Sequence, residues 1–493
     1  MRRDNVLIIW VGVVVWAIAF FLITVKSFYR FFDHDENLYV AGAYLISKGY
    51  LPYFDFRYTH WPLQPLIMAP LMKIFSHKLL VFRVTNSMFA AASIFLIFCA
   101  AYIESAKREA GRKVGIVIGI IMALCVLCNP VFIYTSGVAW NHDLATFLAL
   151  LSLMFLLWNT EPTNIFLAAL FLGLASCTRL NFILGFPLLF LWVIFHKLPW
   201  KSFILGSLVG GLPAMFFFFL NPKIFYANTV TSQKAHLAYL HAIGNSEVTT
   251  LDYKLIFLKK VFLASSSSTL IIGIVFCLLS ATKIKDKAIQ ISVALSFMQI
   301  FFPFLTATVY LQYLYAPLML MALTSAITLV KIYSDFRHRH LGKIFIACLA
   351  VYAVFTSLTY ANAYVGTLKL ASQEKLTVPH MIHRIALDFD QASPPGRFLT
   401  LWPIFATEAE RELYLGLADG PFTWRDSLTL ENPREFSLPE FKAILEGIIR
   451  ERPAAIVLGC ETKRIEKKLF DLAHELNFSL KLTRYRFLLF TPN

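Results

Sequence analysis

Long apolar runs alternate with short polar loops over the first 360 residues of the chain. A helix needs about 20 mostly apolar residues to cross a bilayer. Runs of about this length, some of them shorter, fall at 6–26, 79–103, 114–132, 143–158, 163–178, 182–196, 202–221, 261–281, 288–305, 313–331 and 343–360. The pattern predicts a polytopic α-helical membrane protein with about eleven transmembrane helices.

Basic residues are distributed unevenly between the loops that join these runs. The loops 133–142 and 306–312 contain no Lys or Arg. The alternate loops carry Lys107, Arg108, Arg112, Lys113, Lys197, Lys201, Lys283, Lys285, Lys287, Lys331, Arg337, Arg339 and Lys343. Because cytoplasmic loops carry the excess of Lys and Arg, we expect a cytoplasmic N-terminus. The loops 27–78 and 222–260 and the tail after 361 are then extracytoplasmic.

Shorter periodic segments lie in these outer regions. ENLYVAGAYLISKG (36–49), LQPLIMAPLMKIF (63–75) and SQKAHLAYLHA (232–242) are typical of amphipathic helices in the membrane interface. In the tail we predict strands at 397–402, 454–460 and 480–490, and helices at 406–418, 438–451 and 463–476. We therefore predict a transmembrane domain at 1–360 and a small extracytoplasmic α/β domain at 361–493.

Composition agrees with this organisation. The chain is 58% hydrophobic and 15% charged, whereas soluble domains are roughly a quarter charged. The net charge of +15 follows from the basic loops, and no basic stripe with interleaved aromatics indicates nucleic-acid binding. The seven cysteines form neither a disulfide framework nor a zinc pattern. The first apolar run is long and lacks a cleavage site, so we interpret it as a transmembrane helix rather than a signal peptide.

Three acids, Asp33, Asp35 and Glu36, follow the first apolar run. A charge beside the membrane is costly unless it is solvated or used. Asp35 and Glu36 share a helical face with Tyr39, so the acids could simply begin a helix, where an acid is worth under about 1 kcal/mol. A catalytic carboxylate is the other interpretation, and spacing alone leaves both open.

Further polar residues fall on the same predicted side. WNHD (140–143) brings His142 and Asp143, and CTRLN (177–181) brings Arg179 into an otherwise apolar stretch. A cation there needs an anionic partner, which is a lipid headgroup, one of the acids or a substrate phosphate held by both guanidinium nitrogens. Weaker candidates, each with packing or anchoring as the alternative, are His60 in YTHWP, Lys234, His236, Gln312 and Tyr313.

The order of these motifs resembles the GT-C superfamily of membrane glycosyltransferases that use polyprenyl-phosphate sugars. The likeness is strongest to the branch of protein O-mannosyltransferases and bacterial lipid A aminoarabinose transferase, and it covers most of 1–360. It rests on the acids with Tyr39, GYLPYFDFRYTHWPLQPL (49–66), NHD (141–143), GLASCTRLNFILGFPLLFLWVI (173–194) and YLQYLYAPLMLMAL (310–323).

The resemblance implies roles for several residues. Asp35 would be the catalytic base with Glu36 beside it, Asp143 would bind acceptor or orient the site, and Arg179 would face the donor phosphate. Asp33 is an additional acid and departs from the family pattern. The sequence shows no clear metal-ligand set, so no cofactor is assigned and the use of a divalent metal stays open.

The expected reaction is inverting transfer of a sugar from a polyprenyl-phosphate donor to a glycolipid, glycan or protein acceptor, in a bacterial inner membrane. If the acceptor is a phosphate, no base is required and Asp35 becomes a positioning group. The sequence leaves the sugar and the acceptor open. A transporter or flippase of a lipid-linked sugar and a non-catalytic assembly subunit are the alternatives. A transporter favours charges near the midplane and paired repeats, and neither is visible in the sequence.

Overall fold

The computed structural model describes residues 3–108, 111–263, 287–336, 340–374 and 376–493. The chain divides into two compact units, each made of three segments. The first, which we call the helical unit, comprises Met1–Ser27, Thr85–Pro213 and Thr250–Gln373. The second, the loop-and-tail unit, comprises Phe28–Val84, Ala214–Thr249 and Glu374–Asn493. Most of the two predicted outer loops is therefore grouped with the tail.

The predicted apolar runs are largely helical where the structure describes them, but the run 114–132 is divided at Cys128 and Asn129 into two helices, and the run 182–196 begins in a 3₁₀ helix. The helices are α1 (Arg3–Tyr29), α4 (Lys78–Lys107), α5 (Arg112–Leu127), α6 (Pro130–Thr135), α7 (His142–Trp158), α8 (Pro162–Thr178), α9 (Gly185–Phe195), α10 (Trp200–Leu220), α13 (Leu251–Leu263), α15 (Lys287–Leu305), α16 (Tyr315–Phe336) and α17 (His340–Gln373). Short 3₁₀ helices, η1 (Leu180–Leu184) and η4 (Leu311–Leu314), precede α9 and α16. The predicted boundary at 361 falls within α17.

Four of the described helices are long and apolar enough to cross a membrane by themselves. They are Trp10–Tyr29, Lys78–Lys107, Trp200–Leu220 and Leu311–Ser334. Shorter apolar helices include His142–Trp158, Pro162–Thr178, Leu180–Phe195 and Ile289–Leu305, so the count of eleven spans stays a prediction. Most of the run 261–281, together with Lys283, Lys285, Arg337 and Arg339, lies outside the described residues.

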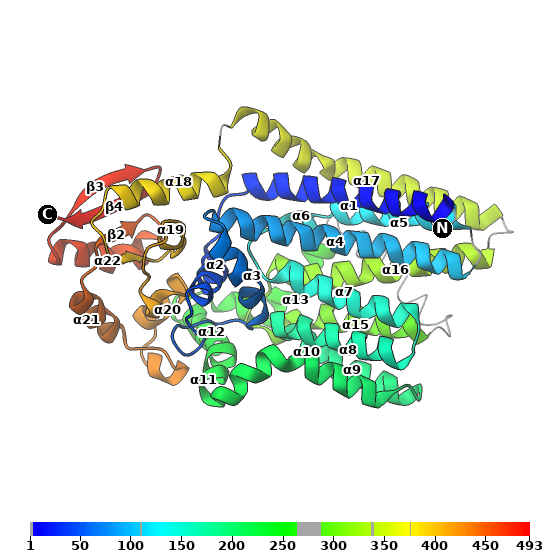
Figure 1. Cartoon of the computed structure of the whole chain (residues 1–493), viewed down its shortest axis with the longest axis horizontal. Coiled ribbons are helices and arrows are strands. Elements are labelled where there is room, and N and C mark those ends of the chain that lie inside the picture. Colours follow the sequence, from blue (N-terminus) through cyan, green and yellow to red (C-terminus); the bar gives the residue numbers. More distant parts are fainter. Residues whose placement is uncertain (1–2, 109–110, 264–286, 337–339, 375) are drawn as a thin grey trace. The chain divides into compact units, whose positions relative to one another are not determined.

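Small residues allow close packing within the helical unit. α7 lies beside α8 (Figure 1), and α8 also approaches α10. At the α8–α10 contact, a Cβ on Gly206 would lie 2.2 Å from the Phe166 carbonyl oxygen, and one on Gly210 would lie 2.3 Å from the Leu170 carbonyl oxygen. Glycines four residues apart thus bring two backbones together, which is a common way for apolar helices to associate.

The loop-and-tail unit contains the predicted interfacial helices. α2 (His34–Ser47), α3 (Leu63–Ile74) and α12 (Ser232–Ala242) confirm the helices predicted at 36–49, 63–75 and 232–242. α2 ends before Gly49, which has a φ of 95° that favours glycine. The short helix α11 (Pro222–Tyr226) and the π-helical turn η2 (Ala227–Thr231) precede α12, and the 3₁₀ turn η3 (Ser246–Thr249) follows it.

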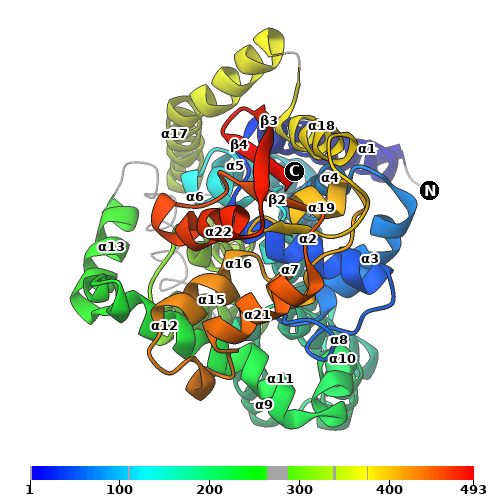
Figure 2. The same cartoon turned by 90° about the vertical axis from the view of Figure 1, so that its left-hand side faces the viewer.

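A four-stranded sheet forms the core of the tail. The strands are β1 (Phe398–Thr400), β2 (Ala455–Leu458), β3 (Phe478–Arg484) and β4 (Phe487–Pro492), in the order β1-β2-β4-β3. β1 pairs with β2 in parallel, with Leu399 opposite Ile456, and the other pairs are antiparallel. Figure 2 shows this sheet beside α22 (Lys463–Glu475). The remaining helices are α18 (Val378–Gln391), α19 (Ile404–Glu408), α20 (Pro421–Thr429) and α21 (Phe441–Glu451), with 3₁₀ turns η5 (Leu415–Leu417) and η6 (Pro433–Phe436).

Two predictions for the tail were wrong. The helix predicted at 406–418 ends at Glu408, and Glu410 has a φ of 53°, a left-handed conformation that no α-helix continues. The single strand predicted at 480–490 is a hairpin that turns at Tyr485, which has the same φ. Helices α18 and α20 were not predicted. α21 and α22 confirm the helices predicted at 438–451 and 463–476.

A buried ion pair fixes the start of α2. Asp33 is the N-cap, and its side chain accepts a hydrogen bond from the backbone N–H of Asp35 at 3.0 Å. Glu36 accepts the backbone N–H of Asp33 at 3.1 Å, which completes a capping box. Both oxygens of Glu36 also accept from Arg83 of α4, at 2.9 and 2.6 Å, and both side chains are 0% exposed. Arg83 donates further to the carbonyl of Arg30.

Removing one partner of this pair leaves a buried charge without its counter-ion. We expect Arg83→Met to lower the free energy of unfolding by about 3–5 kcal/mol, and the double variant Glu36→Gln/Arg83→Met to recover part of that loss. Thermal unfolding in one fixed lipid mixture measures both, with the exposed Lys73→Met as the control. If Arg83→Met were as stable as the control, the ion pair would not be what stabilises the start of α2.

Candidate active site

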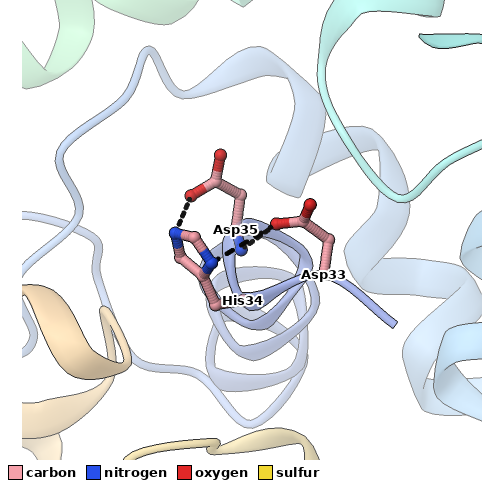
Figure 3. Close-up of side chains that lie close together, drawn as sticks. All are labelled: Asp33, His34 and Asp35. Atoms are coloured by element: carbon pink, nitrogen blue, oxygen red, sulfur yellow. Dashed lines mark hydrogen bonds and ion pairs between the residues drawn. The ribbon is translucent and has the colours of Figure 1, made fainter. Parts of the chain in front are cut away.

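Asp35 lies at the first turn of α2, between the capping residues (Figure 3). Its Oδ1 is 3.2 Å from His34 Nε2, and His34 Nδ1 is 3.7 Å from Asp33 Oδ1. The Asp35 side chain is 36% exposed. Its neighbours Asp33 and Glu36 are both used by the helix cap. Asp35 is therefore the acid of this group whose carboxylate is accessible and takes no part in the cap.

The surroundings of Asp35 make it a better proton acceptor than an ordinary aspartate. Burial raises the pKa of Asp35 above its usual 3.8, although part of the side chain stays accessible. The charge of His34 acts against this rise, Asp33 adds to it, Arg425 opposes it and Glu36 adds to it. A carboxylate whose pKa is moved toward neutrality suits general-base catalysis.

The side chains of Asp33, His34 and Asp35 also place three ligand-type atoms within 4.8 Å of one another. Each nitrogen of His34 faces a different carboxylate, and Asp33 Oδ1 already accepts a backbone N–H. In Figure 3 the imidazole lies against the two acids, and the three side chains do not point to one shared centre. This is the geometry of an ion-paired helix cap, so we assign no metal ligands here.

Arg425 of α20 lies close to this group. Its guanidinium carbon is 4.5 Å from the ring centroids of both Tyr239 and Phe422. Nε is 3.1 Å from Asp426 Oδ1, and Nη2 is 3.1 Å from Nδ1 of His236 on α12. The Phe422 ring also contacts the His34 ring, with 5.8 Å between centroids. α2, α12 and α20, from three separate segments, therefore meet within the loop-and-tail unit.

His236 is a neutral acceptor in this arrangement. Burial, with the charges of Arg425 and His34, lowers the pKa of His236 to about 4. The neutral ring can accept a hydrogen bond at Nδ1 from Arg425. Lys234, the other candidate on α12, is exposed. Sequence reasoning missed Arg425, because α20 was not predicted.

A second charged pair joins the first outer loop to α20. Arg57 Nε is 3.5 Å from Asp419 Oδ2, and Arg57 Nη1 donates to Thr423 Oγ1 at 3.3 Å. Asp419 is fully buried, and burial raises its pKa to about 6 in spite of the Arg57 charge. Asp419 also accepts from Thr423. This pair orients α20 and has no free carboxylate oxygen at the surface.

Tyr39 and His60 lie together, as neighbours in the same unit. Their ring centroids are 4.9 Å apart in an edge-to-face contact. The backbone carbonyl of His60 accepts from the Tyr53 hydroxyl at 2.7 Å. Tyr39 is buried, whereas His60 is partly exposed. Of the two side chains, only His60 is accessible enough to contact a substrate.

The helical unit brings three other candidates together. Arg179 follows α8, and its Nη1 donates to Asn141 Oδ1 at 2.6 Å and lies 3.0 Å from His142 Nε2. Its guanidinium carbon is 5.8 Å from the ring centroid of Tyr313 in η4. Asn141 is held in turn by the carbonyl of Thr178. The end of α8, the start of α7 and η4 thus form one polar cluster around a cation.

Asp143 points elsewhere. Its Oδ1 accepts from the Tyr315 hydroxyl at 2.6 Å, and its Oδ2 accepts from the backbone N–H of Gly137 at 2.8 Å. The residue is buried. Gly137 has a φ of 72°, and a Cβ there would lie 2.7 Å from Ser87 Oγ, so the turn that presents its N–H needs glycine. Asp143 joins α7, α16 and this turn.

No protein-family model matches the chain, and no curated protein matches it. Solved structures do. ArnT from Cupriavidus metallidurans bound to undecaprenyl phosphate is similar with a TM-score of 0.64 at 13% identity, over 99% of this chain and 97% of that one. The apo form of that protein gives 0.61 with the same identity and coverage.

The oligosaccharyltransferase of Archaeoglobus fulgidus in complex with zinc and sulfate is similar with a TM-score of 0.53 at 11% identity, over 94% of this chain and 69% of that one. Both proteins are GT-C superfamily members. The chain has the GT-C fold. The resemblance seen in the sequence motifs is therefore confirmed at the level of the fold. Both of these neighbours are glycosyltransferases.

The neutral state of His236 predicts a pH dependence. Because the folded pKa is about 4 and the ordinary value is 6.5, the unfolded chain binds more protons between these values. Stability attributable to His236 therefore rises with pH across this window and is lost as pH falls through it. Relative to His236→Gln, we expect the wild type to lose of the order of 1–3 kcal/mol between pH 6.5 and pH 4.

Chemical unfolding at a series of pH values measures this difference. The exposed His241→Gln, on the same helix, is the matched control and should follow the wild type. Parallel curves for the wild type and His236→Gln would mean that His236 protonates as freely in the folded protein as in the unfolded chain.

Proposed function

We propose that this protein is an inverting glycosyltransferase that moves a sugar from a polyprenyl-phosphate donor to an acceptor outside the cytoplasm. The GT-C fold supports the reaction class. The observation that carries the proposal is the state of Asp35, an accessible carboxylate beside two acids that are both consumed by the helix cap. In a fold of this class, an accessible carboxylate that takes no part in the helix cap and has a histidine beside it fits a general base.

In the proposed step, an acceptor hydroxyl oxygen attacks the anomeric carbon and forms the new glycosidic bond. The bond from that carbon to the phosphate oxygen breaks, and the polyprenyl phosphate leaves with the electron pair. The acceptor proton passes to the Asp35 carboxylate. A single displacement inverts the anomeric centre. Glu36, bound to Arg83, would position α2 and thereby Asp35.

We further propose that Arg179 binds the donor phosphate. Its guanidinium is oriented by Asn141, His142 and Tyr313. Arginine can hold a phosphate through two nitrogens and stabilises the charge on a leaving phosphate. ArnT, a similar structure, was determined with undecaprenyl phosphate bound, which supports a polyprenyl-phosphate partner here.

The other candidates take supporting roles in this proposal. Asp143 would orient the helix that carries His142, and His60, Tyr39, Lys234 and Tyr313 would contact or shape the substrate region. We place the protein in a bacterial inner membrane with about eleven spans, a cytoplasmic N-terminus and a periplasmic tail. The apolar helices and the membrane-embedded structural neighbours support an integral membrane protein.

Asp35→Asn tests the base. We expect transfer from a panel of polyprenyl-phosphate sugars to fall about 100- to 10,000-fold, because the amide cannot accept the proton, while donor binding persists. The assay uses purified protein in lipid, and the exposed Asp252→Asn is the control. Full turnover in Asp35→Asn would contradict the proposed role. Absence of turnover with every donor, from folded wild type, would favour a transporter or an assembly subunit.

Arg179→Gln tests the donor site. Hydrogen bonds to a charged group are worth about 1.5–3 kcal/mol, so we expect the Kd for undecaprenyl phosphate to rise about ten- to hundredfold. Arg179→Lys should lie between the wild type and the glutamine variant, since lysine keeps the charge without the bidentate geometry. Lys113→Gln, an exposed cation of the helical unit, should bind normally. Unchanged binding in Arg179→Gln would exclude this role.

A further inference from the structure

The guanidinium of Arg425 is held by contacts on several sides. Two aromatic rings, Tyr239 and Phe422, flank its guanidinium at 4.5 Å, and such cation–π contacts add of the order of 1 kcal/mol each. Asp426 and His236 engage two of its nitrogens. The side chain is 11% exposed. Within the described residues, Nη1 has no hydrogen-bond partner, so the group is fixed while one donor stays unused.

The charges around α2 explain why a fixed cation matters there. Three carboxylates occur within four residues, at Asp33, Asp35 and Glu36. Arg83 neutralises Glu36, and the cap hydrogen bond stabilises Asp33. Asp35 has His34 as its neighbour, but that side chain is 47% exposed. An arginine side chain keeps its positive charge over the whole ordinary pH range.

We propose that Arg425, which the tail contributes, is a positioning residue for Asp35. Its guanidinium supplies a permanent positive charge near the start of α2, because it stacks on the Phe422 ring that contacts His34. Two side chains connect Arg425 to Asp35. The Phe422 ring that covers Arg425 also contacts His34, and His34 contacts Asp35. The consequence for catalysis depends on the proposed function of Asp35, whereas the electrostatic relation between the two side chains does not.

Several charged groups act on the pKa of Asp35, and each comes from an identified element. His34, Asp33 and Glu36 belong to the start of α2, and Arg425 belongs to α20. Asp426 and the neutral His236 contact Arg425 in turn. Arg425 is the permanent cation of this set, because a guanidinium keeps its charge between about pH 5 and 9. Removing it should therefore leave Asp35 harder to ionise across that whole range.

The first test compares pH profiles of kcat/KM for sugar transfer in lipid. In Arg425→Met, which keeps the length and loses the charge, we expect the acidic limb to move to higher pH by about 0.5–1 unit. Arg425→Lys, which keeps the charge, should restore most of the wild-type limb. Arg434→Met, an exposed arginine of the same tail that is 78% accessible, should not move it. A uniform loss of activity at all pH values, with the limb unmoved, would reduce Arg425 to a structural residue.

The second test needs no turnover. Infrared spectra of the Asp35 carboxyl, obtained by subtracting Asp35→Asn spectra at each pH, follow its ionisation directly in the wild type and in Arg425→Met. The proposal requires the titration to move to higher pH in the variant. Identical titrations would overturn it. If the titration moves but no donor supports transfer, the electrostatic relation stands and the proposed glycosyltransferase function is the part that fails.

Discussion

The start of α2 depends on the buried pair between Glu36 and Arg83. Neither side chain reaches solvent, so each is stable only with the other present. Because Glu36 also belongs to the capping box with Asp33, the pair helps to fix the chain direction at Asp33. Asp35 then lies between two acids whose oxygens are used by the helix cap, and it is the most exposed of the three, at 36% against 25% for Asp33 and 0% for Glu36.

The unit that carries Asp35 is assembled from segments far apart in the chain. α2 and α3 come from the first outer loop, α12 from the second, and α20 from the tail. Arg57 with Asp419 and Arg425 with His236 connect these segments through charged groups of the tail. Such contacts make the tail part of the environment of the candidate base. The charge on the tail therefore belongs to the electrostatic surroundings of Asp35.

The chain shares its fold with solved structures to which it is only 11–13% identical. The architecture therefore constrains few individual residues. Apolar helices in a membrane need hydrophobic surface and, at close contacts, small residues such as Gly206 and Gly210. Many sequences meet these conditions. The polar groups of a site are more restrictive, since a buried charge requires a particular partner.

The sequence by itself determined the apolar helices and the helices at 36–49, 63–75 and 232–242, and it singled out Asp35 and Arg179 as candidates. These follow from local periodicity and from rare charges in apolar surroundings, which need no long-range information. It did not determine that the chain would turn at Glu410, nor that 480–490 would form a hairpin, because short tail elements are fixed by tertiary packing. Glu36 with Arg83, and Arg425 with Tyr239, join residues that are 47 and 186 (425 − 239) positions apart. Only the tertiary structure could decide those partners, because the energy of a charge depends on what the fold places beside it.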